Sequence, residues 1–237
     1  MKLLLVIAAL AAVGLLLYWG LHFYLSLSAS RKLVERTTAF KNLSQNMSVP
    51  LLVLGDSTAV GIGANTPEES VPGRVAASLK ATFVENHAVV GATVDDLRSQ
   101  IAQAQLQHYR LILIQIGAND MVRFRDAEAA ADVLADAVSK LPSADKVIVI
   151  SAGDLGTARI FPPPLRHLYS SINRAYHRSF ADVTNSQGVT YVDLSRGPGA
   201  ERFAEDPAQY FADDNFHLSS EGYGLWFEAV QGHLPTR

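Results

Sequence analysis

Cysteine is absent from the 237-residue sequence, and charged residues are scarce, at 18% of positions. Without cysteine the chain has no disulfide, no thiolate metal site, no cysteine nucleophile and no thiol-linked lipid anchor. The scarcity of charge, together with 49% hydrophobic residues, excludes an intrinsically disordered protein. The sequence also has no internal repeat and no low-complexity tract, which excludes a repeat array.

The few charges are unevenly distributed along the chain. Residues 1–41 contain five basic residues and one acidic residue, a net charge of +4. The remainder contains 15 basic and 22 acidic residues, a net charge of −7. Because a body of this charge repels phosphate backbones, we expect no nucleic-acid partner. By the same argument, neutral or zwitterionic small molecules are expected to suit this body better than anionic ones.

The N-terminal segment carries no charged side chain between Leu3 and Ser30. Aliphatic residues dominate its first half, and four aromatic residues then cluster as in a membrane interface belt: Tyr18, Trp19, Phe23 and Tyr24. A helix over residues 3–27 would be about 37 Å long, enough to cross a hydrocarbon core of about 30 Å. We therefore predict a transmembrane anchor over residues 1–30. The alternative is a cleaved signal peptide, with residues 28–30 (Ser-Ala-Ser) as the cleavage site.

Residues 31–48 are polar and lack a strong apolar period, so they are predicted to form a linker, either a tether or an entry helix. The 189 residues from 49 to 237 are enough for a single domain with a full core. The four basic residues that follow the anchor place this domain in the cytoplasm if the positive-inside rule is applied literally.

Short, mainly apolar runs alternate with amphipathic helical patterns throughout the domain. The predicted strands are Leu51–Leu54, Thr82–Val90, Leu111–Ile116, Lys146–Ser151 and Val189–Leu194. The predicted helices are Val71–Ala81, Val94–Gln107, Ala127–Lys140, Leu165–Ser186 and Ser219–Val230. This alternation predicts an α/β fold, a flavodoxin-like three-layer α/β/α sandwich around a parallel sheet of about five strands. Ligands bind at the carboxyl ends of the strands in such folds.

The first predicted strand leads into residues 55–63, Gly-Asp-Ser-Thr-Ala-Val-Gly-Ile-Gly. This segment lacks the Gly-Lys-Ser/Thr of a P-loop and the third glycine of a dinucleotide-binding fingerprint. Ala59 stands two residues after Ser57, which excludes the G-x-S-x-G elbow. What remains is a serine at a strand-to-helix turn, beside a helix N-terminus that favours anionic species.

Three further segments place polar groups at the same edge of the predicted sheet. The second strand ends at Gly91, which can expose its backbone N–H, and the third ends in Gly-Ala-Asn-Asp at residues 117–120. Near the C-terminus, residues 214–217 read Asp-Asn-Phe-His. A spacing of three lets the carboxylate of Asp214 reach the imidazole of His217 and orient it.

Taken in order, these four segments resemble the four sequence blocks of the SGNH hydrolases, also called the GDSL esterase/lipase family. The resemblance covers about residues 50–233 and departs from the name motif at Thr58, where the family has leucine. It implies that Ser57 is the nucleophile, His217 the general base and Asp214 the residue that orients His217. It also implies an oxyanion hole made by the backbone N–H groups of Ser57 and Gly91 and the side chain of Asn119. Neither a metal nor an organic cofactor is implied.

Each of these residues has a simpler interpretation as well. Ser57 would serve as a helix cap, and Asn119 or Gly91 as turn residues. Asp213 is the alternative partner of His217. Two carboxylates are expected to brace turns only: Asp56 and Asp120. The remaining histidines lack a comparable partner in the sequence and are expected at the surface or in packing: His22, His87, His108, His167, His177 and His233.

Residues 160–164, Ile-Phe-Pro-Pro-Pro, follow the fourth strand. They predict either a rigid connector with its apolar pair buried or a hydrophobic lip for an acyl chain.

The favoured function is a membrane-anchored serine esterase or lipase that cleaves acyl esters, lysophospholipids among them, through an acyl-enzyme on Ser57. The enzymatic alternative is an O-acetyl esterase of cell-wall or exported carbohydrate, and the non-enzymatic one a binding module on the same fold. No obligate protein partner is indicated. The resemblance favours an extracytoplasmic domain, against the charge count.

Overall fold

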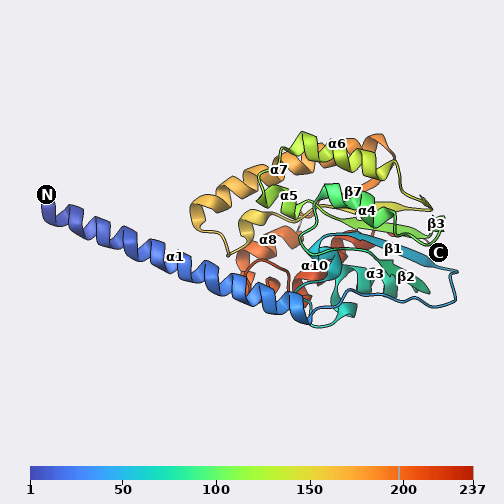
Figure 1. The fold of residues 1–237 in the computed structure, drawn as a ribbon, viewed down its shortest axis with the longest axis horizontal. Helices are drawn as coiled ribbons and strands as arrows, with labels where there is room; N and C mark the ends of the chain where they lie inside the picture. Colours follow the sequence, from blue (N-terminus) through green and yellow to red (C-terminus); the bar gives the residue numbers. More distant parts are fainter. Residues whose placement is uncertain (197, 237) are drawn as a thin grey trace.

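A computed structural model describes residues 1–196 and 198–236 and contains a five-stranded parallel sheet at its centre (Figure 1). The strand order is β2-β1-β4-β6-β7, and every neighbouring pair is parallel. The strands are β1 Pro50–Gly55, β2 Phe83–Asn86, β4 Leu111–Gln115, β6 Val147–Ile150 and β7 Thr190–Val192. Two further short strands, β3 His108–Tyr109 and β5 Ser143–Ala144, pair with each other at the opposite end of the sheet from the site described below. All five predicted strands are confirmed.

The α-helices are α1 Lys2–Arg36, α2 Ser57–Val60, α3 Val71–Leu79, α4 Leu97–Ile101, α5 Ala118–Val122, α6 Ala127–Val138, α7 Pro163–Ser186, α8 Pro198–Glu205, α9 Pro207–Tyr210 and α10 Ser220–Gln231. Several of them cover the two faces of the sheet. Successive residues of β1 point to opposite faces, so Leu52 and Leu54 pack beneath α4, α6 and α7, whereas Leu51 and Val53 pack against α3 and α10. Both faces are thus buried in apolar cores, which confirms the three-layer sandwich.

The helix predicted over Val94–Gln107 is wrong in its second half. A 3-10 turn, Val94–Asp96, leads into α4, which ends at Ile101. Beyond it, the backbone N–H groups of Gln105 and Leu106 donate to the Glu85 carboxylate and the Tyr109 hydroxyl. These buried side-chain acceptors replace the helical hydrogen bonds, an effect of tertiary structure that periodicity does not register.

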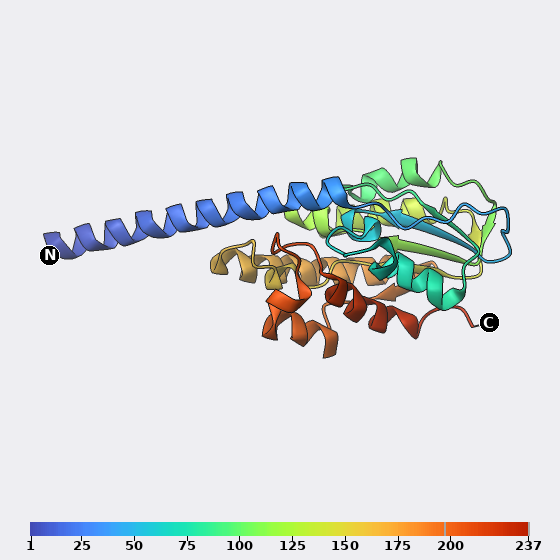
Figure 2. The same cartoon turned by 90° about the horizontal axis from the view of Figure 1, so that it is seen from below.

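The helix α1 is continuous from Lys2 to Arg36 and projects far beyond the domain in both views (Figure 1, Figure 2). It has the length and composition to cross a membrane, features that an N-terminal signal sequence shares. Residues 31–36 belong to this helix, as the entry-helix interpretation of the linker predicts.

The rest of the linker packs along the edge of the sheet. Asn42 forms an antiparallel bridge with Val84 of β2, and the Ser44 hydroxyl donates to the Thr82 carbonyl at 2.5 Å. The Val49 N–H donates to the Thr82 hydroxyl at 2.9 Å. We call residues 37–49 the strap. Because these bonds hold it to the edge of the sheet, the strap is not a free tether.

Candidate active site

The turn after β1 positions Ser57 at the carboxyl edge of the sheet. Gly55 has φ +138°, and a Cβ atom there would lie 1.9 Å from the Gln115 carbonyl oxygen, so only glycine fits. Asp56 caps α2, because its Oδ1 accepts hydrogen bonds from the Thr58 N–H at 2.9 Å and the Thr58 hydroxyl at 2.8 Å. This agrees with the structural role expected for Asp56, and burial raises its pKa to about 6.

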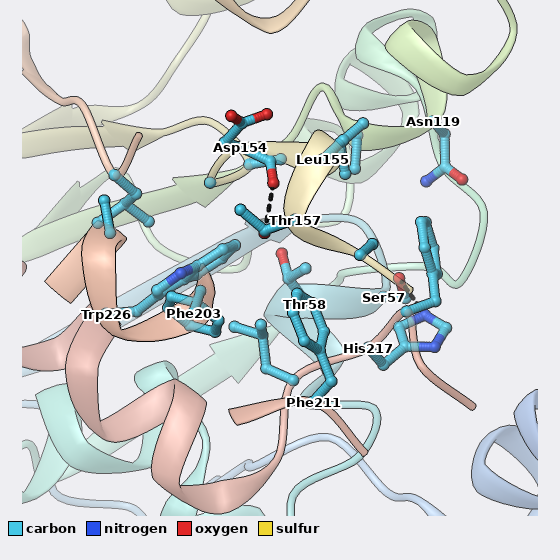
Figure 3. A pocket seen from close by; sticks show the side chains of 18 residues that line it. Ser57, Thr58, Asn119, Asp154, Leu155, Thr157, Phe203, Phe211, His217 and Trp226 are labelled. Carbon is cyan, nitrogen blue, oxygen red and sulfur yellow. Dashed lines mark hydrogen bonds between the residues drawn. The ribbon is translucent and has the colours of Figure 1, made fainter. Parts of the chain in front are cut away.

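The loop 214–217 brings a carboxylate and an imidazole to Ser57. Asp214 Oδ1 accepts the backbone N–H groups of Phe216 (3.0 Å) and His217 (2.9 Å), while its Oδ2 lies 2.6 Å from His217 Nδ1. His217 Nε2 lies 3.0 Å from Ser57 Oγ (Figure 3). Asn215 adopts φ +59°, the left-handed conformation that asparagine tolerates, which lets the loop turn this tightly. Three residues predicted from the sequence therefore form one hydrogen-bonded chain.

Asp214 is held in its ionised form. Burial opposes ionisation, but the hydrogen bonds from His217 and from two backbone N–H groups outweigh it, so the pKa of Asp214 lies below its usual value. An ionised Asp214 accepts the Nδ1 proton of His217, which leaves Nε2 to face Ser57 as a base. The alternative partner, Asp213, is exposed, and the carboxylate bonded to His217 is that of Asp214.

Three hydrogen-bond donors follow the carboxyl ends of β1, β2 and β4, the edge of the sheet that carries Ser57. Within the described residues, the backbone N–H groups of Ser57 and Gly91 donate to no protein acceptor. Gly91 has φ +81°, and its carbonyl is held at 3.1 Å by Arg123. The amide of Asn119, in the first turn of α5, donates to the Ala92 carbonyl at 3.0 Å and keeps a second N–H available. Asn119 thus fixes the segment that carries Gly91, and its side chain lines the same pocket as Ser57.

Sequence reasoning missed Gln100, which lies buried on α4. Its Oε1 accepts the Gly55 N–H at 2.7 Å, and its Nε2 donates to the Gly55 carbonyl at 2.9 Å. The amide side chain therefore satisfies both backbone groups of the residue that starts the nucleophile turn. A glutamine on the apolar side of a predicted helix was the available signal.

The expectation for the other histidines is wrong in part, because three of them have a carboxylate partner. His87 lies 2.8 Å from Glu85, His108 lies 3.1 Å from Asp145, and His177 lies 3.1 Å from Asp193. The pairing of β3 with β5 brings His108 to Asp145, and the packing of α7 brings His177 to Asp193, which sequence spacing does not reveal. His87 and Glu85 are instead two residues apart along the chain. Of the described residues, no group of three or more His, Asp or Glu is placed to hold a metal ion.

An apolar pocket opens beside Ser57 and His217. Its far end, opposite Asn119, is lined by Phe203 and Trp226 (Figure 3). Its polar lining includes Thr58 and Thr157. The pocket extends from the serine hydroxyl into a mainly apolar interior, which suits a hydrocarbon chain attached to a reactive carbonyl.

The loop 160–164 follows the connector interpretation. Ile160 and Phe161 are buried in the core, and Pro163 begins α7, where a proline is well tolerated. Neither apolar residue of the loop lines the pocket. Asp120, as expected, braces its turn by accepting the Val94 N–H at 3.2 Å and by pairing with Arg125.

Comparison with solved structures identifies the fold. A lipolytic protein of the G-D-S-L family from Veillonella parvula superimposes with a TM-score of 0.61 at 16% identity, covering 78% of this chain and 97% of that one. A phospholipase A1 from Streptomyces albidoflavus gives 0.60 at 16% identity, covering 78% and 98%. An acetylxylan esterase from Geobacillus stearothermophilus gives 0.57 at 19% identity, covering 84% and 98%. At these identities the likeness is one of fold.

Sequence comparison identifies the family. The chain is 31% identical over 186 residues to a GDSL-like esterase of Mycobacterium tuberculosis, a match that covers 75% of this chain and 59% of that relative. The chain therefore spans less than two thirds of the relative's length. A family model matches residues 53–225, a range that begins before Ser57 and includes Asn119 and His217. The chain belongs to the GDSL-like lipase/acylhydrolase family.

Proposed function

We propose that the protein hydrolyses carboxylic esters through an acyl-enzyme on Ser57. The observation that carries the proposal is the chain Ser57–His217–Asp214, with distances of 3.0 and 2.6 Å, at the mouth of an apolar pocket. A serine hydroxyl is a weak nucleophile near neutral pH and needs an adjacent base, which His217 supplies. Membership of the family supports the same reaction class.

In the first half of the reaction, Ser57 Oγ attacks the ester carbonyl carbon while its proton moves to His217 Nε2. The carbonyl oxygen becomes an oxyanion that accepts hydrogen bonds from the Ser57 and Gly91 N–H groups and the Asn119 amide. When the C–O bond to the leaving group breaks, His217 returns the proton to the departing alcohol. Ser57 is then acylated, and the alcohol is free.

In the second half, water attacks the acyl carbon as His217 takes one of its protons. Collapse of this second oxyanion breaks the bond to Ser57 Oγ, and His217 returns the proton to the serine. The products are a carboxylic acid and the free enzyme. Throughout, Asp214 holds the Nδ1 proton of His217 and stabilises the imidazolium that forms twice in each cycle.

The apolar lining of the pocket favours an acyl chain longer than acetyl, so we propose lipid esters such as lysophospholipids as substrates. A series of p-nitrophenyl esters from acetyl to palmitoyl, assayed on the full chain in detergent, tests this. Peak kcat/KM at a medium or long chain is the expected result. A peak at acetyl would favour the alternative, an O-acetyl esterase of carbohydrate.

A fluorophosphonate probe separates an enzyme from a binding module on the same fold, because it reacts only with an activated serine. We expect labelling of the wild-type chain at Ser57 and none of the Ser57→Ala variant, which serves as the matched control. Absence of labelling in the wild type would overturn the enzyme proposal.

We also propose that α1 is retained as an anchor and that the domain lies outside the cytoplasm. The contacts of α1 with the domain, described below, support retention, because cleavage after residue 30 would remove two of them. The C-terminus lies at the end of the domain away from α1 (Figure 1), so a reporter can be fused there without covering the site. Activity of a reporter that works only in the cytoplasm would reverse the assignment.

A further inference from the structure

The anchor helix packs directly on the loops that carry the candidate active site. His22 Nε2 lies 2.9 Å from the Arg159 carbonyl oxygen. Ser26, which is buried, lies 3.4 Å from the amide of Asn215, the residue that follows Asp214. Leu33 is buried against Val60 and Ile62, in and just after the helix that Ser57 begins.

These contacts form one continuous face of α1. Residues 22, 26 and 33 return to the same side of a helix with 3.6 residues per turn. Because α1 is unbroken between Lys2 and Arg36, its membrane-spanning part and its domain-packed part are a single rod. The orientation of the catalytic edge relative to the membrane is therefore set by this rod.

The length of the part of α1 that does not contact the domain sets the distance between the domain and the bilayer. The 20 residues from Lys2 to Leu21 precede the first of these contacts and form about 30 Å of helix, the thickness of a hydrocarbon core. Apart from Trp19, which is half-buried, their large apolar side chains are exposed in the structure. A bilayer that covers this part ends where His22 meets the Arg159 carbonyl, which is at the carboxyl edge of the sheet.

That edge bears exposed apolar side chains of its own. Outside α1, seven large hydrophobic residues are exposed among those the structure describes; two, Leu43 and Met47, are in the strap. The other five follow the carboxyl ends of β2, β4 and β6 and form what we call the apolar rim: Val89, Val90, Phe124, Leu165 and Leu168. Phe124 packs against Tyr169 of α7, the helix that also carries Leu165 and Leu168. Exposed apolar side chains on neighbouring elements of this kind indicate an interaction surface.

Phe124 is the clearest member of the rim. The residue is 58% exposed although its backbone adopts φ +56°, a conformation that is costly for a bulky residue. A row of ring contacts runs from it to the site, with centroid distances of 5.5, 4.2, 6.0 and 5.1 Å, through Phe124, Tyr169, Phe161, Phe216 and His217. Phe216 lines the pocket, so the rim and the pocket are joined by packed aromatic side chains.

Basic side chains accompany the rim. Arg123 and Arg159 are exposed beside it, and Arg166, between Leu165 and His167, is half-buried. Arginine at the headgroup level with apolar and aromatic residues below it is the composition of a membrane-interface surface. This local pattern contrasts with the net charge of −7 of the body as a whole.

We propose that the apolar rim rests on the same bilayer that holds α1, so that the pocket takes its ester from the lipid surface. The occupant is the boundary between headgroups and acyl chains, contacted by Phe124, Leu165 and Leu168 and flanked by the arginines. The proposal rests on the proposed function, namely an esterase anchored by α1. It adds that the ester substrate enters the pocket from the bilayer and not from water.

The absence of native cysteine makes a direct test possible. Two full-chain variants, Phe124→Cys and Leu168→Cys, are each labelled with an environment-sensitive fluorophore at the new cysteine. Each is then reconstituted in phosphatidylcholine vesicles that contain nitroxide-labelled lipid as the quencher. Gln107→Cys, exposed at the opposite edge of the sheet, is the matched control. We expect quenching at positions 124 and 168 several-fold stronger than at 107.

Equal quenching at all three positions would overturn the proposal, as would quenching that depends on protein density, which would assign the rim to a second copy of the chain. This readout needs no catalysis, so it is separate from a failure of the proposed reaction. A second measurement uses Leu168→Asp: hydrolysis of vesicle-embedded esters is expected to fall several-fold while hydrolysis of a short water-soluble ester stays unchanged. Equal loss on both substrates would contradict lipid contact.

Discussion

Among the residues that the structure describes, a histidine lies between a serine and an aspartate at each end of the sheet. At the carboxyl end, Ser57, His217 and Asp214 are buried, with 7% and 0% of the histidine and aspartate side chains exposed. At the amino end, Ser143 Oγ lies 3.0 Å from His108 Nδ1, and His108 Nε2 lies 3.1 Å from Asp145. The latter two side chains are 57% and 38% exposed. The distances are similar, so distance alone does not distinguish the two.

Their surroundings do distinguish them. Ser143 donates its proton to the Gln107 carbonyl at 2.8 Å, and Asp145 is shared with Arg110 at 2.5 Å. Ser57 instead lies at a helix N-terminus, near free N–H groups and an apolar pocket, while Asp214 accepts two backbone N–H groups. Electrostatic interactions are stronger where water is excluded. A serine, a histidine and an aspartate within hydrogen-bond distance therefore do not identify the candidate site by themselves. Burial of the side chains, nearby backbone hydrogen-bond donors and an adjacent pocket distinguish it.

The most severe way to break the comparison is to remove the buried serine. Ser57→Ala is expected to lower kcat by about 10⁴- to 10⁶-fold, because no nucleophile remains beside His217. The fold is expected to persist, because the Ser57 hydroxyl bonds to His217 and does not cap α2. The cap of that helix is Asp56. Ester hydrolysis measures the first effect and circular dichroism checks the second. Activity near the wild-type level would show that another residue is the nucleophile.

Removing the Asn119 amide, a hydrogen-bond donor with no counterpart near Ser143, should have the next largest effect on catalysis. Asn119→Ala is expected to lower kcat by about 10²- to 10³-fold, the usual effect of deleting one oxyanion donor. Its effect should be mainly on kcat for a short soluble ester, since the oxyanion forms only in the transition state. A change confined to KM would mean that Asn119 binds substrate rather than the developing charge.

Much of this site was predictable from the chain because its residues end strands that alternate with helices. Parallel topology brings Ser57, Gly91 and Asn119 to one edge, and a spacing of three joins Asp214 to His217. Gln100 was missed because its role lies in pairing with the backbone of Gly55, 45 positions away. Similarly, α4 ended early because the Glu85 carboxylate, from β2, took over the N–H of Gln105. Local patterns do not encode such distant partners.

Burial can also be tested through pH. Because burial raises the pKa of Asp56 to about 6, against 3.8 for the free side chain, its charged form is disfavoured in the fold. The contribution of Asp56 to the free energy of unfolding is therefore fully present below about pH 4. It falls by on the order of 3 kcal/mol as the pH rises through about 6.

Asp56→Asn, which can keep the bond to the Thr58 N–H, is expected to be more stable than the wild type at pH 7 and equal to it at pH 4. Urea unfolding across this range measures the difference. A stability difference independent of pH would refute the assignment. At the exposed end, Asp145 behaves oppositely, because its hydrogen bond with Arg110 lowers its pKa.

The smallest effect is expected at the exposed grouping itself. His108→Ala should leave ester hydrolysis unchanged and alter the free energy of unfolding by no more than about 0.5 kcal/mol, as surface substitutions usually do. It is the control for Ser57→Ala under identical assay conditions. A clear loss of activity in His108→Ala would show that the two groupings are coupled or that burial is the wrong criterion.

The strap has a consequence for how the protein tolerates crowding. An open parallel sheet leaves unpaired N–H and C=O groups on its outermost strands, which invite pairing with another chain and lead to aggregation. Here the strap closes one side by bonding Asn42 to Val84 of β2, and the other side, β7, offers only the three residues Thr190–Val192. If α1 is retained as the proposed anchor, molecules meet one another at high density within the plane of a bilayer. The strap would then let many copies share that membrane without their sheets joining edge to edge.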